Sequence, residues 1–339
     1  MKRSFITLIA AAACMFLLIM DAQTALMGAK DGINLCMMTV IPSLFPFFVL
    51  SALLTSALSG IRAGFLRPVG RLCGMPPGAE GVFLIGLLGG YPTGAQSVTQ
   101  LYRSGQLEKT QAQRLLGFCS NAGPAFIFGI CGALFPKGWM VWILWLVHIL
   151  SAVTTGILLK GNGTSQIKPK KPSTQTLPQA LDRAIKTTAR VCGWIVLFRV
   201  LIAFLDRWAL WILEPGWKTV IAGILELTNG CCQLGRIENA GSRFVLASAF
   251  LSFGGICVWM QTASVVEELG TAMYLRGKLL QTSISVFVSL LVQWLLFPEE
   301  HRLTVEPFLL IPMIICVLFV IVFLAIYEKK SSNPVPVGV

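Results

Sequence analysis

The sequence has little charge. Only 12% of its 339 residues are Asp, Glu, Lys or Arg, whereas a soluble domain carries about 25%. Hydrophobic residues make up 55%, and the mean hydropathy is +0.75. Several apolar runs are long enough to cross a bilayer, so the composition excludes an ordinary soluble domain and indicates an integral membrane protein whose first partner is lipid.

Acidic residues are scarcer than basic ones, 15 against 27, and the formal net charge is +12. The basic residues lie mainly in short loops between apolar runs and are not interleaved with exposed aromatic residues. This pattern is typical of orientation signals and headgroup contacts, and it argues against nucleic-acid binding.

Side chains that serve metals or catalysis are also few. There are two histidines, His148 in an apolar run and His301 in a loop, and ten cysteines without a C-x-x-C spacing. The sequence therefore predicts no metal site, disulfide frame or cofactor. It also lacks G-x-S-x-G, H-E-x-x-H and P-loop motifs, so we expect a protein that is neither an enzyme nor an ATP-driven pump.

The apolar runs predict membrane helices, two of them interrupted by glycine and polar residues at 81–98 and 219–232. The first run resembles a signal peptide, but it continues past Cys14 to Met20, which favours a retained helix. Residues 160–180 are rich in Lys, Pro, Ser and Thr and predict a solvated linker. The expected spans are residues 5–20, 33–58, 115–135, 139–159, 191–205, 244–266, 279–297 and 308–327.

The basic loops constrain the topology. They fall on one side of the membrane only if 81–98 enters and leaves by the same face, which the positive-inside rule makes cytoplasmic, with both termini there. By the same reasoning 219–232 dips in from the opposite face. The residues counted are Lys2, Arg3, Arg62, Arg67, Arg71, Arg103, Lys109, Arg114, Lys160, Lys168, Lys170, Lys171, Arg276, Lys278, Lys329 and Lys330.

The predicted fold is an all-α polytopic membrane protein built as an inverted repeat. Each half reads span, re-entrant hairpin, broken span, span. The first half is 1–159 with its hairpin at 81–103, and the second is 181–339 with its hairpin at 216–236. Inverted repeats with two re-entrant hairpins and two broken helices are typical of secondary transporters.

The four interruptions predict a shared polar site. Non-helical backbone survives at membrane depth only where protein or a water-filled cavity covers it. Small residues can also serve helix packing, so packing remains the alternative at each break. The expected site residues are Gly90, Tyr91, Pro92, Thr93, Gly94, Ser120, Asn121, Gly123, Pro124, Glu226, Thr228, Asn229, Gly230, Gly254, Gly255 and Gln261.

Two charges fall inside apolar stretches. Glu226 lies in "ELTNG", where it can serve as a proton site or as a neutral, hydrogen-bonded residue that holds the hairpin together. Arg199 can neutralise an anionic substrate, pair with Glu226, or extend toward Asp206.

The motifs "GGYPTGAQSVTQLYRSGQLEKTQAQRLLGFCSNAGPAFIFG", "LELTNG" and "FGGICVWMQ" resemble the sporulation integral membrane proteins of the nucleoside-recognition, or Gate, domain family. The resemblance runs from about residue 30 to 297, and it implies a core like that of concentrative nucleoside transporters. Two departures stand out: "SNAGP" replaces an Asn-Asn or Asn-Ser run, and Trp259 stands where a histidine is expected.

The resemblance further implies a transporter of a small carboxylated or aromatic solute. The cargo it implies is dipicolinic acid, exported from the mother cell through the outer forespore membrane during sporulation. The alternatives are a transporter of nucleosides or other organic anions, and a non-transporting scaffold for spore or envelope assembly. A homo-oligomer is also compatible with the sequence.

Overall fold

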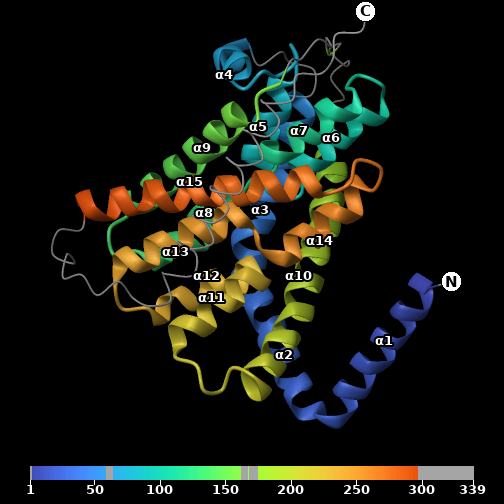
Figure 1. The fold of residues 1–339 in the computed structure, drawn as a ribbon, viewed down its shortest axis with the longest axis vertical. Helices are drawn as coiled ribbons and strands as arrows, with labels where there is room; N and C mark the ends of the chain where they lie inside the picture. The colour runs from blue at the N-terminus through green and yellow to red at the C-terminus, as the bar shows by residue number, and fades with distance from the viewer. Residues whose placement is uncertain (1, 59–63, 162–166, 168–174, 297–339) are drawn as a thin grey trace, which may run out of the picture.

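The computed structural model describes residues 2–58, 64–161, 167 and 175–296. The regular secondary structure of these residues is all helical, and they contain no strand (Figure 1). Five of its helical segments are long and apolar enough to cross a membrane: 22–54, 139–158, 177–208, 240–266 and 272–296. The prediction of an all-α, multi-pass membrane protein is confirmed.

The first helices run further than the apolar pattern predicts. Helix α1 (Lys2–Met20) is followed by α2 (Ala22–Leu35), a π-helical turn (Cys36–Val40) and α3 (Ile41–Leu58). Asp21 begins α2 by accepting a hydrogen bond from the Thr24 N–H at 3.2 Å. The long helix therefore begins before the predicted residue 33, in a stretch whose polar residues lower its hydropathy.

The predicted hairpin at 81–103 and the broken span after it are both helical with clear interruptions. Helices α5 (Glu80–Gly89) and α6 (Thr93–Arg103) meet at residues 90–92, after the short α4 (Arg67–Leu72). Helices α7 (Lys109–Cys119) and α8 (Pro124–Gly129) are separated by extended residues 120–123. Helix α9 (Trp139–Leu158) completes this half.

The second half repeats this order. Helix α10 (Leu177–Trp208) begins with a capping box between Thr176 and Gln179, within the predicted linker and before the expected residue 191. The hairpin consists of α11 (Pro215–Leu225) and α12 (Leu227–Gln233), and the broken helix of α13 (Ala240–Phe253) and α14 (Gly255–Val266). Helix α15 (Ala272–Leu296) begins seven residues before the predicted 279, so Arg276 and Lys278 lie in the helix and not in a loop. The predicted span 308–327 lies outside the described residues.

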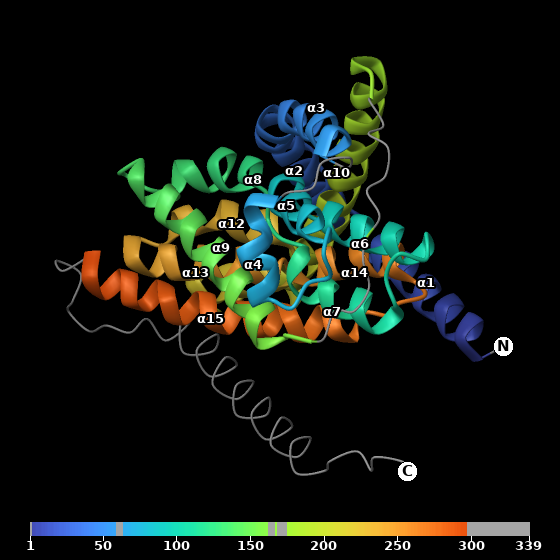
Figure 2. The same ribbon diagram turned by 90° about the horizontal axis from the view of Figure 1, so that it is seen from above.

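The helices form a bundle, and the two long helices α10 and α15 pack across it. Helix α10 packs along α2 and α3, while α15 packs against α7, α9 and α13 (Figures 1 and 2). The α2–α10 crossing is close because Gly28 and Gly32 face Ala203 and Val196, where a Cβ would come within 2.9 Å. In Figure 1, α5 and α6 lie toward one end of the long axis, and α11 and α12 lie toward the other.

The loops at one end of the bundle are tied together by hydrogen bonds. Arg114 is nine-tenths buried, and its guanidinium donates to the carbonyls of Cys73 at 2.8 Å and Gly74 at 2.5 Å. Arg103 forms an ion pair with Glu268 at 3.7 Å. The ends of α4, α6, α9 and α14, which carry or adjoin much of the basic charge, therefore gather together.

Candidate functional site

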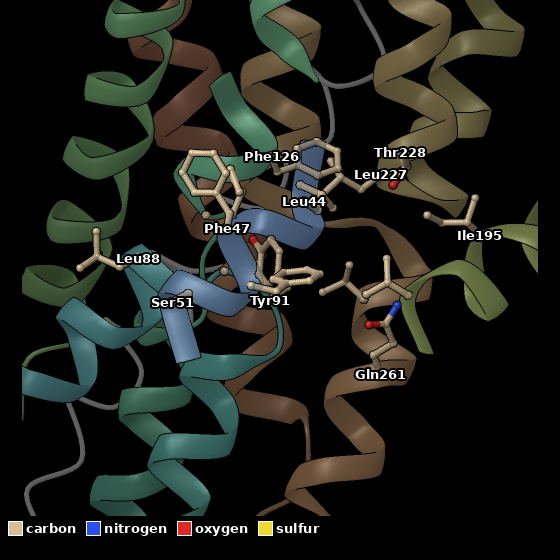
Figure 3. Close-up of a pocket in the computed structure, with 18 of the residues that line it drawn as sticks. Leu44, Phe47, Ser51, Leu88, Tyr91, Phe126, Ile195, Leu227, Thr228 and Gln261 are labelled. Carbon is tan, nitrogen blue, oxygen red and sulfur yellow. The ribbon is translucent and has the colours of Figure 1, made fainter. Parts of the chain in front are cut away.

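A cavity lies where the two hairpins and the two broken helices meet (Figure 3). Its volume is about 70 Å³ in this structure, and the empty space between atoms reaches about 670 Å³ when the open mouth is included. Most of its wall is apolar, with a few polar groups. The lining residues are Leu44, Phe47, Phe48, Ser51, Leu88, Gly89, Gly90, Tyr91, Ala122, Gly123, Ala125, Phe126, Val191, Ile195, Glu226, Leu227, Thr228, Val258 and Gln261.

Six of the predicted site residues line this cavity. Each of the two hairpins and each of the two broken helices contributes at least one of them. They are Gly90, Tyr91, Gly123, Glu226, Thr228 and Gln261. The other predicted residues do not line it. These are Pro92, Thr93, Gly94, Ser120, Asn121, Pro124, Asn229, Gly230, Gly254 and Gly255.

Each hairpin tip rests on the break of its own half. Gly90 has φ +71°, and a Cβ there would lie 3.1 Å from the Gly123 nitrogen, in the break between α7 and α8. Gly255 has φ +82°, and a Cβ there would lie 3.2 Å from the Leu227 nitrogen, at the tip of the second hairpin. Glycine is required at both positions because L side chains rarely adopt this conformation.

Next to each hairpin tip, a pair of glycines lets the two hairpin helices pack closely against the helix that precedes the break. A Cβ on either Gly86 of α5 or Gly94 of α6 would collide with the Cys119 carbonyl, at the end of α7. In the second hairpin, Gly223 of α11 packs on the Phe250 ring of α13, and a Cβ on Gly230 would collide with Gly223. The two halves thus have paired glycines that permit close helix packing at corresponding places.

Side chains from other helices satisfy backbone groups that the breaks release. The Tyr91 hydroxyl donates to the Leu251 carbonyl at 3.1 Å, near the end of α13. His148 of α9 accepts from the Ala122 N–H at 3.2 Å through Nε2, and its Nδ1 lies 3.4 Å from the Ser252 hydroxyl. Nδ1 therefore carries the proton, and the imidazole joins the two breaks. Nothing in the sequence around His148 indicated this role.

Glu226 separates α11 from α12 and caps α12. Its carboxylate accepts from the Thr228 N–H at 3.0 Å, the Asn229 N–H at 2.7 Å and the Asn229 Nδ2 at 2.9 Å. The hairpin is interrupted at this residue, while Thr228, Asn229 and Gly230 lie within α12. All three bonds are accepted by the carboxylate, which favours the structural role of Glu226; its role as a proton site stays a prediction.

We expect Glu226→Gln to destabilise the protein by about 1–2 kcal/mol, because the amide offers one acceptor oxygen and turns its NH₂ toward donors. Thermal unfolding in detergent measures the effect. The matched control is Glu214→Gln, at the N-cap of α11, where the side chain makes no capping bond. Equal melting temperatures for the two variants would refute the capping role.

Arg199 does not pair with Glu226 or extend to Asp206 in this structure. Its guanidinium donates to Asp31 of α2 at 3.0 Å. The predicted roles of Arg199 as a partner of Glu226 or Asp206 are therefore corrected: the residue ties α10 to α2. Asp31 was overlooked because it precedes the predicted start of the span.

Lys278, expected before the start of the last span of the repeat, lies inside α15 and in the interior of the bundle. Its side chain is fully buried, and Nζ donates to the Gln281 Oε1 at 2.6 Å and to the Tyr91 hydroxyl at 3.2 Å. Gln281 in turn donates to the Asn121 Oδ1 at 3.0 Å. The break between α7 and α8, the first hairpin tip and α15 are therefore connected by one buried polar chain.

A recess separates the cavity from a polar groove along α10 and shares residues with both. The recess shares Phe48, Ser51 and Gly89 with the cavity. That recess in turn shares Arg183 and Thr187 with the groove. The groove is lined by Gln96, Gln175, Gln179, Asp182, Arg183, Lys186, Thr187 and Arg190.

The described residues contain no cluster of three or more His, Cys, Asp or Glu side chains that could hold a metal ion. The nine cysteines in this part of the chain are free thiols.

Comparisons with known proteins point to one relative. No family model matches the chain, and no solved structure matches it. The sequence is 25% identical over 340 residues to the sporulation integral membrane protein YlbJ of Bacillus subtilis (strain 168), covering 84% of this chain and 82% of the relative. The chain is thus an integral, multi-pass membrane protein homologous to the sporulation protein YlbJ.

Proposed function

We propose that the protein is a membrane transporter of a small carboxylated aromatic solute, with dipicolinate as the first candidate. The observation that carries the proposal is the cavity that residues of both hairpin tips and both broken helices line. Discontinuous helices around a central solute site are a recurrent transporter arrangement.

An inverted repeat accounts for how the two halves are built. The hairpin, the helix packed against it and the break follow in the same order in each half, and the hairpins lie toward opposite ends of the bundle in Figure 1. In this proposal both hairpins are re-entrant, the gathered basic loops face the cytoplasm, and the two halves alternate access to the cavity. The membrane proposed is the outer forespore membrane, which the family resemblance implies; the relative is a sporulation integral membrane protein.

The groove along α10 is the proposed access route, and its charge supports an anionic cargo. Lys186 forms an ion pair with Asp182 at 2.7 Å. No carboxylate in the described ranges lies within ion-pair distance of Arg183 or Arg190. These two cations leave a net positive groove that raises the local concentration of anions at its mouth.

The test of the proposal is a thermal-shift screen of the purified protein against dipicolinate, its neutral diamide, benzoate and uridine. A ligand at 100 times its Kd stabilises the folded state by about 2.7 kcal/mol, so dipicolinate should raise the melting temperature by a few degrees. A shift with uridine alone would favour the nucleoside alternative. No shift with any of these compounds would favour a scaffold and overturn the proposal.

A further inference from the structure

Lys278 occupies an unusual position for a lysine in a membrane protein. It lies in the second turn of α15, and its side chain has no exposed surface. Nζ lies 5.1 Å from the centre of the Tyr91 ring and 6.0 Å from that of Tyr274. The ammonium is thus held between two aromatic faces in the interior of the bundle.

Among the described residues, no acidic side chain forms an ion pair with this ammonium. The ion pairs of the described residues involve other groups, and Glu226 directs its carboxylate to the start of α12. Arg114, the other buried cation, has backbone carbonyls around it, whereas Lys278 contacts two neutral side chains. A buried charge without a counter-ion is costly, and in a membrane protein it marks a functional group.

In its protonated form, the Lys278 amine has one N–H donor that the described contacts do not engage. An ammonium has three N–H donors, and the described contacts engage two of them, with Gln281 and Tyr91. Gln281 fixes the position of the head group, since Gln281 is itself held by Asn121 at 3.0 Å. The ammonium therefore has a defined position and unused hydrogen-bonding capacity.

Tyr91 contacts both the solute cavity and Nζ of Lys278. It lines the cavity (Figure 3), its ring centre lies 5.1 Å from Nζ, and it follows Gly90, whose φ is +71° at the hairpin tip. For Nζ to reach a solute in the cavity, the phenol of Tyr91 has to rotate away from Nζ. The Tyr91 hydroxyl would then give up its place to an acceptor on the solute.

We propose that Lys278 is the carboxylate-recognition residue of the solute site and that Tyr91 covers it when no solute is bound. This inference rests on the proposed transport function and deepens it by naming the group that selects an anion. When the solute binds, its carboxylate replaces the Tyr91 hydroxyl as an acceptor for Nζ. The buried ammonium gains the counter-ion that the protein does not supply.

The competing explanation is that Lys278 only joins α15 to the first hairpin. Interhelical hydrogen bonds of this kind are common in membrane proteins. A structural lysine would affect every ligand and the fold equally. A recognition residue would affect acids selectively, so the test compares an acid with a neutral analogue of the same shape.

The experiment measures the affinity of dipicolinate and of its diamide, by isothermal titration, for the parent, Lys278→Met and Lys278→Arg. We expect Lys278→Met to weaken dipicolinate binding about 10- to 100-fold, the loss of one buried charge-assisted hydrogen bond, and to leave the diamide within about threefold. Lys278→Arg, which keeps the charge, should restore much of the preference for the acid. Arg276→Met is the control, because it removes an exposed cation two residues away.

The outcomes separate this inference from the function on which it rests. If the parent binds neither compound, the proposed function and this inference both fail. If the parent binds dipicolinate and Lys278→Met binds it equally well, the function stands and the role of Lys278 is wrong. Equal losses for acid and diamide would also overturn it in favour of a structural lysine. Lys278→Gln is the second neutral variant should methionine prevent folding.

Discussion

Replacing Gly86 by alanine is expected to destabilise the protein by about 3 kcal/mol or more and to abolish solute binding. A single methyl group at this position would meet the Cys119 carbonyl, and it would lie 3.3 Å from the Gly94 Cα on the other arm of the hairpin. Neither obstacle is the flexible end of a side chain, so the backbone itself would have to move. That movement would lift the hairpin from the helix that leads into the first break.

The matched control is Gly81→Ala in the same helix. A Cβ at Gly81 meets no atom within 4 Å, so alanine should be neutral or stabilise the helix by up to about 1 kcal/mol. Both variants are compared by size-exclusion chromatography and thermal unfolding in detergent. Similar melting temperatures for the two variants would show that Gly86 does not pack tightly against the Cys119 carbonyl of α7.

Ser51→Trp is expected to reduce transport by more than tenfold while the protein still folds. Ser51 lies on α3, and it lines both the solute cavity and the recess that leads to the α10 groove. An indole at this position would occupy the passage between the two spaces. The measurement is uptake of labelled dipicolinate by proteoliposomes that contain equal amounts of folded protein.

Leu50→Trp controls for the bulk of the new side chain. Leu50 precedes Ser51 on the same helix, but its side chain is 63% exposed on the outer surface of the bundle. It should transport as the parent does, since an indole there contacts lipid. Normal transport by Ser51→Trp would exclude the α10 groove as the access route.

The backbone interruptions could be predicted from the sequence because they depend on local chemistry. Residues 90–92, the break at 120–123 and the turn at Gly254 all fall where glycine, proline or a small polar residue interrupts an apolar run. The helix boundaries were less predictable. Helix α10 begins in a polar segment, and the polar Lys30 and Asp31 lower the hydropathy of α2, so both helices extend beyond their apolar runs.

The burial of Lys278 was missed, although a signal was present. Lys278, Gln281, Ser285 and Ser289 follow one another at intervals of three, four and four, so they share one face of a helix, and all four are fully buried. This polar face packs inward, where the Ser285 hydroxyl lies 2.6 Å from that of Ser248 on α13. A count of basic residues near helix ends cannot distinguish such a lysine from a loop residue.

The apolar wall of the cavity could not have been predicted. Phe47 and Phe48 on α3, Phe126 on α8 and Ile195 on α10 line the cavity, but their residue types are the same as those that face lipid. In a membrane protein the hydrophobic pattern does not separate the interior from the surface, because both are apolar. Only the packing of distant segments against one another decides which of these side chains meet a solute.

The most direct test of the transport proposal is counterflow of labelled dipicolinate in proteoliposomes made with the unmodified protein. Vesicles are loaded with unlabelled dipicolinate and diluted into a trace of the labelled compound. We expect labelled dipicolinate to accumulate transiently in vesicles that contain the protein. Vesicles loaded with the neutral diamide in place of unlabelled dipicolinate should not show this accumulation. Label that enters no faster than in protein-free vesicles, with dipicolinate or with any of the other screened solutes, would contradict transport as the function of this protein.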